Sequence, residues 1–375
     1  MDDVWDLLRG QRADREQAGL VRRPRARTPN DPVLDLASND HLGLSRHPDV
    51  VAAGRTALAQ WGAGSTGSRL VTGTTALHLE LEAELARRCG APAALVLSSG
   101  YLANLAAVTA LATALDTTLV ISDERNHASL VDACRLARVP VAVVPHADPG
   151  AVEELLEGHD GRALVVTDAV FSVDGTLAPL RELHAVVRRH RALLLVDEAH
   201  GLGVLGPDGA GACAELGLSE EPDLVRTVTL SKSLGSQGGA VLGPAVLRDH
   251  LIDTARPFVF DTGLAPACAA AALAALNLVD APRLARLREV GEALADGLGV
   301  ARTPGAAVQV PVGDSHRAVA VQQACLSAGV WVGCFRPPSV PSGHACLRLT
   351  ARADLSADEL QTAVRVVRQA LGGPA

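Results

Sequence analysis

The sequence has no long apolar run and no closely paired cysteines, and each absence excludes a class of protein. No stretch approaches the roughly 18 uninterrupted apolar residues of a membrane span, and the start, Met1 to Asp6, lacks the basic and apolar regions of a secretory signal. The seven cysteines never stand in C-x-x-C spacing, so neither a disulfide framework nor a zinc site is indicated. We therefore expect a cytoplasmic protein that binds no metal.

Aromatic residues and net positive charge are scarce as well. Aromatics make up 2% of the chain, so aliphatic side chains must fill the core. Lys and Arg together number 34 against 42 acidic residues, which gives a formal charge of -8 and disfavours a nucleic-acid binder. A chain of 375 residues with 48% hydrophobic content is long enough for two domains, or for one large domain with an appendage.

Lysine is nearly absent, because Lys232 is the only one in the chain and arginine supplies every other basic position. A guanidinium stays protonated, whereas an amine can lose its proton and act as a nucleophile or base. Lys232 is therefore a candidate for chemistry. The alternative is that a single lysine survived by chance in an arginine-biased composition.

Strand-like apolar runs alternate with helical periodicity from about Leu34 to Pro266, which predicts a mainly parallel sheet covered on both faces. Residues 1–30 predict a short helix and an arm, and residues 267–298 predict helix with a break at Pro282. The chain from residue 306 onward predicts a smaller α+β domain. The strand-like runs of the large sheet are 93–97, 118–121, 141–144, 163–167, 192–196, 225–230 and 240–242.

The run from Leu193 to His200 places Asp197 and a histidine at the end of an apolar strand, where open α/β sheets bind ligands. The letters Asp-Glu-Ala-His also occur in helicases, but the phosphate-binding G-x-x-x-x-G-K-[ST] motif that helicases need is absent. The segment from Gly201 to Gly206 matches a dinucleotide fingerprint only weakly. A third interpretation is an aspartate that pairs with the protonated ring nitrogen of pyridoxal phosphate.

This third interpretation requires a lysine after a later strand, and Lys232 is the only one available. Thr229 and Ser231 offer hydroxyl groups for a phosphate. The junction at Gly100 provides a helix N-terminus, which favours an anion by roughly 0.3 to 1 kcal/mol, although it could be a simple turn. The glycines after the lysine permit a tight loop around a planar cofactor, and they are Gly235, Gly238 and Gly239.

Two further polar residues also follow predicted strands. His127 could lie flat on a cofactor ring, although a lone histidine at a strand end is more often structural. Ser172 could contact the cofactor, or could be a turn serine. All five polar segments fall at the same edge of the predicted sheet, which favours one shared site.

Five segments of the sequence closely resemble those of the α-oxoamine synthases, which are fold-type I pyridoxal-phosphate enzymes. They are LASNDHLGL at 36–44, GSTGSRLVTG at 64–73, NHAS at 126–129, DEAHG at 197–201 and TLSK at 229–232.

The resemblance spans about residues 5 to 370 and implies an α/β fold. It implies a large domain with a mainly parallel seven-stranded sheet between helices, and a smaller α+β C-terminal domain. The expected division is an N-terminal helix and arm at 1–40, a large cofactor-binding domain at 41–277 and a small domain at 278–375. The family forms homodimers with interface active sites, so we expect the same here.

The resemblance assigns a role to each polar segment. Lys232 would bind pyridoxal phosphate covalently and, once released, remove the Cα proton of the amino acid. Asp197 would pair with the pyridinium nitrogen, and His127 would stack on the ring. His200 and Ser172 would hydrogen-bond the phenolic oxygen of the cofactor.

The remaining family contacts hold the phosphate and the substrates. Gly100, Tyr101 and Thr229 would hold the phosphate, and Thr262 would reach the phosphate of the neighbouring subunit. The other expected contacts are Asn39 and Arg348 on the amino-acid carboxylate, and Arg22 or Arg23 with Ser339 on the acyl group.

Within the family, the resemblance favours a member that joins L-alanine to pimeloyl-CoA or a pimeloyl carrier protein in biotin synthesis. Ser68 stands where glycine-using relatives carry threonine, and the smaller side chain leaves room for the methyl group of alanine. His41 replaces the usual tyrosine, which could alter the substrate entrance. Two alternatives stay open: a sister enzyme that uses glycine or serine, and a cofactor-binding protein without turnover.

Overall fold

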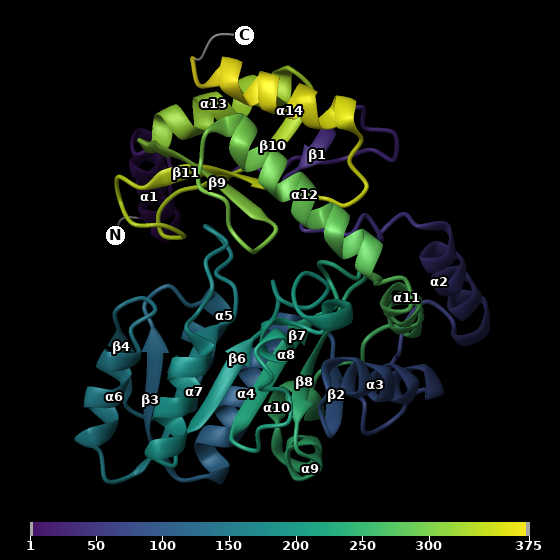
Figure 1. Cartoon of the computed structure of the whole chain (residues 1–375), viewed down its shortest axis with the longest axis vertical. Helices are drawn as coiled ribbons and strands as arrows, with labels where there is room; N and C mark the ends of the chain where they lie inside the picture. Colours follow the sequence, from purple (N-terminus) through teal and green to yellow (C-terminus); the bar gives the residue numbers. More distant parts are fainter. Residues whose placement is uncertain (1–2, 373–375) are drawn as a thin grey trace.

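The computed structural model describes residues 3–372, which form two β-sheets and the helices around them (Figure 1). The outer ends of the first and third expected domains, residues 1–2 and 373–375, lie outside the described residues. The division into three domains stays a prediction.

The larger sheet has seven strands in the order β2-β8-β7-β6-β5-β3-β4. Only β8 runs antiparallel to its neighbours, so β2 points the same way as the parallel strands. The prediction of a mainly parallel seven-stranded sheet is confirmed. The strands are β2 (Ala93–Leu97), β3 (Thr117–Asp123), β4 (Val141–Val144), β5 (Arg162–Asp168), β6 (Leu193–Asp197), β7 (Leu224–Thr229) and β8 (Gly239–Gly243).

Alternate residues of these strands enter two different cores, because successive strand side chains point to opposite faces of a sheet. Val120 and Leu164 pack on one face, under α4 (Gly100–Ala114), α5 (Ala128–Ala137), α9 (Ala245–Thr254) and α10 (Arg256–Val259). Ile121 and Val165 pack on the other, under α6 (Pro149–Glu157), α7 (Leu180–Arg189) and α8 (Ala212–Glu215). The result is a three-layer sandwich.

The smaller sheet has the order β1-β10-β11-β9. A third hydrophobic core links it to the β2 side of the large sheet. The elements are β1 (Leu34–Leu36), β9 (Ala307–Gly313), β10 (Val330–Phe335) and β11 (Ala345–Thr350), with α12 (Ala281–Leu298), α13 (Ser315–Ser327) and α14 (Ala357–Ala370).

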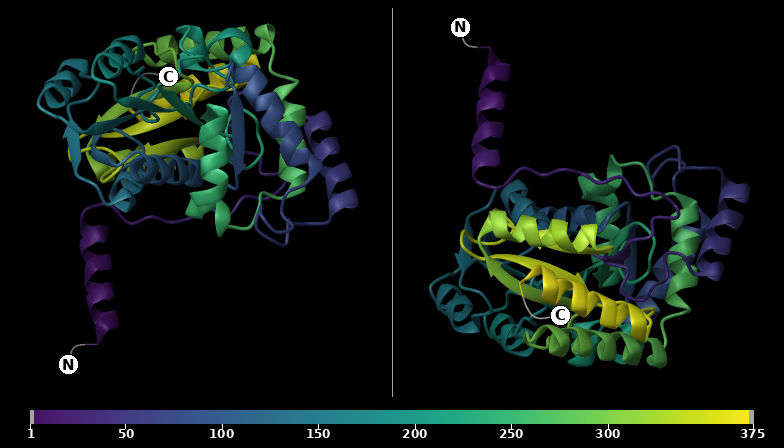
Figure 2. Two further views of the ribbon diagram at one scale, coloured as in Figure 1. Left: turned by 90° about the horizontal axis from the view of Figure 1, so that it is seen from below. Right: turned by 90° about the horizontal axis from the view of Figure 1, so that it is seen from above.

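The remaining helices lie at the side and at the N-terminus of the chain. α2 (Pro48–Trp61), α3 (Ala76–Cys89) and α11 (Pro266–Leu276) pack beside β2, and η1 (Pro207–Gly209) is a short 3-10 turn. The helix α1 (Val4–Gln17) projects away from the body and buries none of its residues (Figure 2). The helix predicted within residues 1–30 is therefore confirmed.

One sequence expectation was wrong in detail, and one strand has a partner that the sequence did not indicate. The apolar run at Leu34 forms β1, which pairs with β10, where Leu34 aligns with Val330. The break within 267–298 lies between α11 and α12, and Pro282 stands in the first turn of α12, where a missing N–H costs nothing.

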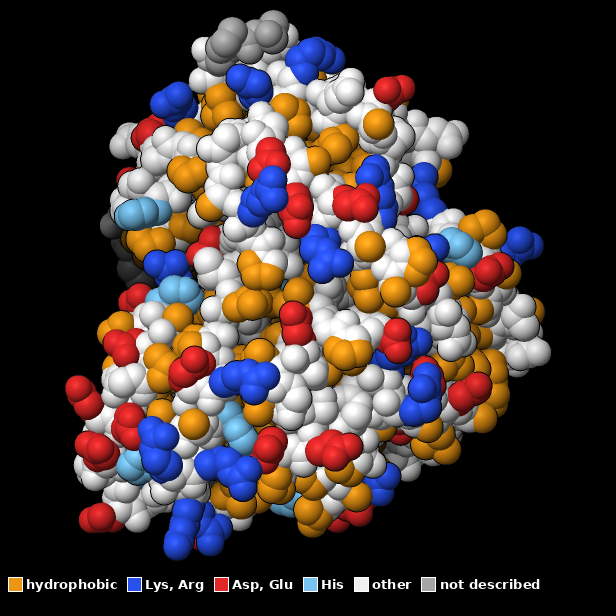
Figure 3. Space-filling model, viewed as in Figure 1, with side chains coloured by type: hydrophobic (Ala, Val, Ile, Leu, Met, Phe, Trp, Pro, Cys, Tyr) orange, Lys and Arg blue, Asp and Glu red, His pale blue; other side chains and the backbone are white. Residues whose placement is uncertain are grey.

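Within residues 3–372, no single helix is long and apolar enough to cross a membrane, and α11 and α12 meet that test only together, as a pair bent by 89°. On the face in Figure 3, basic and acidic side chains are interspersed.

Candidate active site

The candidate site lies at one edge of the seven-stranded sheet, where β2, β3, β5, β6 and β7 all end. Because β2 is parallel to β7 across β8, all five carboxyl ends meet at this edge. The segments after these strands carry the polar residues that the sequence analysis singled out: Gly100, His127, Ser172, Asp197 with His200, and Lys232.

Asp197 is a buried acceptor at the end of β6. Its Oδ2 accepts from Asn104 Nδ2 at 2.7 Å, and its Oδ1 accepts from the backbone N–H of Ala199 at 2.8 Å. The neighbouring residue across the sheet is Asp168, which is also buried and accepts from the backbone N–H of His127 at 2.9 Å. Burial, followed by the charge of Asp197, raises the pKa of Asp168 well above its ordinary value.

Lys232 follows β7 at the same edge. Within residues 3–372, no hydrogen bond or ion pair joins its Nζ to another side chain. Burial lowers the pKa of Lys232 from 10.5 to about 8, although Asp197 and Asp168 act in the opposite direction. The amine of Lys232 therefore loses its proton at a lower pH than the amine of an ordinary lysine.

The N-terminus of α4 forms an open group of backbone donors. Ser99 caps the helix, because its Oγ accepts from Leu102 N at 3.1 Å. The N–H groups of Gly100 and Tyr101 have no acceptor among the described residues, as expected for a first helical turn. The phenol of Tyr101 points elsewhere and donates to Asp132 at 2.5 Å, so Tyr101 offers only its backbone here.

The backbone of Gly100 lies close to Thr229. A Cβ there would lie 3.0 Å from Thr229 Cβ. The Thr229 hydroxyl donates to the carbonyl oxygen of Gly238 at 3.2 Å, so β7 and the loop after Lys232 are joined beside the helix end. This close approach leaves room for a small anion at the backbone donors of α4.

Two histidines that the sequence analysis treated differently lie side by side. The ring centroids of His200 and His41 are 5.9 Å apart. Burial, followed by the charge of Lys232, holds the pKa of His200 well below its ordinary value and lowers that of His41 from 6.5 to about 3. His41 is 1% exposed, and neither ring nitrogen has a hydrogen-bond partner among the described residues. It is therefore a buried neighbour of His200 rather than an open entrance residue.

Arg348, from β11 of the smaller sheet, reaches the same edge. Its guanidinium donates to the carbonyl oxygen of Ser172 at 2.8 Å and to Asn39 Oδ1 at 2.9 Å, and it lies over the Phe335 ring at 4.7 Å. Burial lowers the pKa of Arg348 to about 10. Asn39 and Lys232 both line a cavity of about 1300 Å³, which continues toward the N-terminal arm.

Four residues expected to contact the substrate or the cofactor form no hydrogen bond with Lys232 among the described residues. Ser68 and Thr262 form a backbone bridge with each other, and Thr262 is exposed. Ser339 and Arg22 are also exposed, on the β10 side of the smaller sheet.

Sequence reasoning missed three residues of this edge. Asn104 stands one turn after Gly100 in a mostly apolar helix, and the amide among the alanines and leucines of that turn was the available signal. Asp168 lies one residue beyond the predicted end of its strand. Ser129 was noted only as a neighbour of His127, although the two side chains are 2.6 Å apart.

The donors and acceptors of this edge fit pyridoxal phosphate. The open N–H groups at Gly100 and Tyr101 suit a phosphate, the buried Asp197 suits a protonated ring nitrogen, and the unpaired Lys232 amine suits an aldehyde.

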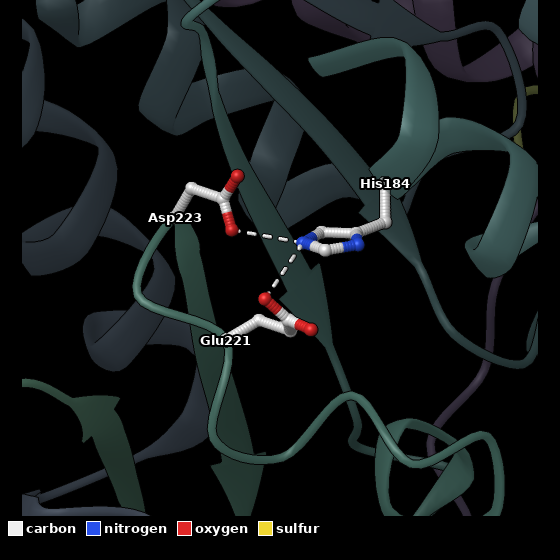
Figure 4. A group of neighbouring side chains, drawn as sticks. All are labelled: His184, Glu221 and Asp223. Atoms are coloured by element: carbon white, nitrogen blue, oxygen red, sulfur yellow. Dashed lines mark hydrogen bonds and ion pairs between the residues drawn. The ribbon is translucent and has the colours of Figure 1, made fainter. Parts of the chain in front are cut away.

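A second group of ionisable side chains lies at the opposite edge of the sheet (Figure 4). His184 Nε2 is 2.8 Å from Asp223 and 3.9 Å from Glu221, a spacing that could hold a metal ion. Arg188 already pairs with Glu221 at 2.6 Å and lies 3.7 Å from Asp223. The arginine supplies the positive charge that an ion would bring, and the expectation of no metal stays a prediction.

Comparisons with known proteins give a consistent picture. The model of the family "Aminotransferase class I and II" matches residues 31–367. An 8-amino-7-oxononanoate synthase of Mycobacterium marinum is 59% identical over 99% of this chain and 95% of its own length.

Two solved structures share the fold. A serine palmitoyltransferase of S. paucimobilis with a bound PLP-myriocin aldimine is 31% identical, with a TM-score of 0.90 over 99% of both chains. An 8-amino-7-oxononanoate synthase of Francisella tularensis is 26% identical, with a TM-score of 0.75 over 91% of this chain and 98% of that one.

Proposed function

This chain belongs to the class I and II aminotransferase family and, within it, to the α-oxoamine synthases, and from that premise we propose its reaction. It condenses L-alanine with a pimeloyl thioester and releases CO₂ and the free thiol carrier, which gives 8-amino-7-oxononanoate for biotin synthesis. The observation that carries the proposal is the unpaired Lys232 amine at the same sheet edge as the buried Asp197, in a chain 59% identical to a synthase of that name.

The cofactor of this enzyme is pyridoxal phosphate. When bound, it draws electron density away from the amino-acid Cα and makes the Cα–H acidic. Lys232 attaches the cofactor through its neutral amine and afterwards accepts the Cα proton at Nζ. The lowered pKa of Lys232 suits both tasks, because each requires an amine without a bound proton.

The other residues of the sheet edge would orient the cofactor. Asp197 would pair with the ring nitrogen and keep a proton there, and His127 would stack on the ring. His200 and Ser172 would hydrogen-bond the phenolic oxygen. The low pKa of His200 supports this role, because a neutral imidazole can donate one hydrogen bond without bringing a second positive charge beside Lys232.

Arg348 and Asn39 hold the carboxylate of the amino acid. They are already hydrogen-bonded to each other, which fixes the guanidinium before the substrate arrives. The charge of Arg348 stays in place at working pH, because its pKa is still about 10.

The acyl substrate meets Arg22 and Ser339. Arg22 is the better candidate of the two adjacent arginines, because Arg23 pairs with Glu16 at 3.1 Å while Arg22 lies near Cys334 of β10. Ser68 leaves space for the alanine methyl group.

The active form is a cytoplasmic homodimer. Large apolar side chains are exposed beside the Ser68–Thr262 bridge: Leu70 at 51%, Val71 at 79% and Phe260 at 69%. A second copy placed over these side chains would bury them and would bring Thr262 toward the phosphate of the other active site.

The direct test of the reaction is mass spectrometry of the product from alanine and pimeloyl-CoA, with the pimeloyl carrier protein as a second donor. The expected product is 8-amino-7-oxononanoate. Glycine and serine are the matched controls, and equal turnover with either of them would contradict the assignment of alanine.

A sister activity with serine is the second candidate, because the serine palmitoyltransferase structure has the higher TM-score of the two. The identity of 59% to a synthase over nearly the whole chain outweighs this likeness. Release of CO₂ from serine and a long-chain acyl-CoA, but not from alanine, would favour the sister activity. The absence of CO₂ release with every pair would favour a cofactor-binding protein without turnover.

Mixing two inactive variants tests the shared site. A mixed dimer of Lys232→Ala and Thr262→Ala chains contains one site that carries neither substitution, if Thr262 serves the neighbouring subunit. We expect a mixture of the two variants to recover up to about a quarter of wild-type activity after subunit exchange. A mixture as inactive as its components would place Thr262 in its own subunit's site.

A further inference from the structure

Asn104 is the centre of a buried hydrogen-bond network that joins three elements of the sheet edge. It projects from α4 and is 1% exposed. Its Nδ2 lies 2.7 Å from Asp197 Oδ2 and 2.8 Å from Ser129 Oγ, and its Oδ1 lies 2.6 Å from Thr227 Oγ1. The amide therefore uses both donors and its acceptor within the protein.

The orientation of the amide follows from its partners. Both oxygens of Asp197 act as hydrogen-bond acceptors, so the amide group that faces Asp197 is the Nδ2 donor. The other amide proton then points at Ser129 Oγ. The reverse orientation would set two acceptors 2.7 Å apart.

The same logic fixes the Ser129 hydroxyl. Its oxygen accepts from Asn104, so its own proton is free to point at His127 Nδ1, 2.6 Å away. The backbone N–H of Ser129 also points at this nitrogen, at 3.2 Å. Two donors that share one nitrogen require an unprotonated Nδ1, which leaves the proton of neutral His127 on Nε2.

The outer nitrogen of His127 is available to a ligand. Within residues 3–372, Nε2 has no hydrogen-bond partner, and the residue is exposed at the site. Burial of the ring's inner edge lowers the pKa of His127, in keeping with a neutral ring.

We propose that Asn104 is a positioning residue that, through Ser129, holds His127 in one tautomer and so presents a fixed Nε2–H donor to an oxygen of the bound substrate. The same amide fixes the Asp197 carboxylate, so one side chain sets the geometry of both groups that flank the cofactor. This proposal rests on the proposed function for the identity of the substrate, but not for the tautomer itself.

The test is the ¹⁵N spectrum of the histidines in the holoenzyme without substrate, in which the His127 signals are identified by their loss in His127→Asn. We expect an unprotonated Nδ1 and a protonated Nε2. In Ser129→Ala the two donors become one, so we expect a mixture of tautomers and a His127 pKa that rises by roughly half a unit to one unit. Ser129→Thr keeps the hydroxyl and should restore the wild-type spectrum.

Asn104→Leu should shift His127 as Ser129→Ala does and, unlike it, should also weaken cofactor binding about tenfold, because Asp197 loses a donor. Asn126→Leu is the matched control, since Asn126 is also a buried amide with three hydrogen bonds but contacts neither Nδ1 nor Asp197. It should lower the melting temperature and leave the His127 tautomer unchanged.

Three outcomes would overturn the proposal: a protonated Nδ1 in the wild type, an unchanged His127 in Ser129→Ala, or an equal shift in Asn126→Leu. Each is measured in the resting holoenzyme. A failure here is therefore distinct from a failure to make 8-amino-7-oxononanoate, which only the product analysis reports.

Discussion

The two ends of β7 each place a basic side chain near carboxylates, with opposite results. At the start of the strand, His184 meets Glu221 and Asp223, and Arg188 pairs with the acids. At its end, Lys232 stands beside Asp197 and forms no ion pair within the described residues. The charged groups of the first cluster are all paired with one another, whereas Lys232 in the second has no ion-pair partner among the described residues.

Whether the charges are paired distinguishes a structural cluster from a reactive one. The residue types do not, because both clusters contain basic and acidic side chains. Ionisable groups whose charges are matched inside the protein gain nothing from a ligand. Groups held unpaired and desolvated carry a cost that a bound ligand can remove, and shifted pKa values mark such sites. The burial that lowers the pKa of Lys232 is an example.

The largest effect should come from removing the unpaired cation. Lys232→Ala removes both the covalent attachment point and the proton acceptor, so we expect turnover to fall at least about 10³-fold and the bound cofactor to lose its resistance to dialysis. Arg188→Ala is the matched loss of a cation at the other end of β7. A comparable loss of turnover in Arg188→Ala would erase the distinction between the two ends.

A pH series sharpens the same contrast. Lys232 must be neutral to attach the cofactor, so the rate of covalent incorporation into the apoenzyme should rise with pH, with a midpoint at about 8. Asp168→Asn should move the midpoint to lower pH, because Asp168 helps to keep Lys232 protonated. A midpoint near 10.5, recorded by absorbance, would mean that the amine is not desolvated.

The reactive end was largely predictable from sequence, because its signals are local. Lys232 is the single lysine, and Asp197 ends a strand that is readable from its apolar run. The pairing of β1 could not be predicted from the sequence. Its three residues pair with the strand at Val330, and nothing in so short a segment indicates a partner that far along the chain.

The hydrogen-bond network and the structural cluster were also invisible in the sequence. Asn104 and Ser129 meet because two helices pack on one face of the sheet, and their 2.8 Å contact depends on side-chain geometry. His184 and Asp223 likewise come from different elements. Such contacts depend on the packed structure rather than on any spacing along the chain.

A moderate effect is expected at the structural cluster. His184→Ala leaves Asp223 without its 2.8 Å partner in a mostly buried place, so stability should fall by about 1 to 3 kcal/mol in a denaturant titration, with cofactor affinity unchanged. Dialysis against a chelator is the control, and it should leave the wild-type melting temperature unchanged because Arg188 supplies the positive charge. A melting temperature that falls on chelation would instead reveal a bound ion.

The smallest expected effect concerns His41. Unlike His184, it is buried with no hydrogen-bond partner for either ring nitrogen among the described residues. Replacement by phenylalanine removes two unpaired polar atoms and keeps a ring of similar size, so the holoenzyme should melt at the same temperature or slightly higher at pH 7. The effect should appear on acidification. Burial lowers the pKa of His41 from 6.5 to about 3, so between these values the unfolded chain holds a proton that the folded chain does not, and stability falls as the pH falls.

His41→Phe removes this linkage, and from pH 7 to pH 5 the variant should lose about 2 kcal/mol less stability than the wild type. His78 and His200, whose pKa values are also lowered by burial, remain in both proteins and cancel in the difference. Parallel losses in the two proteins would show that His41 is protonated or hydrated in solution. In that case His41 would have a hydrogen-bond partner in solution, as His184 has at the opposite edge of the sheet.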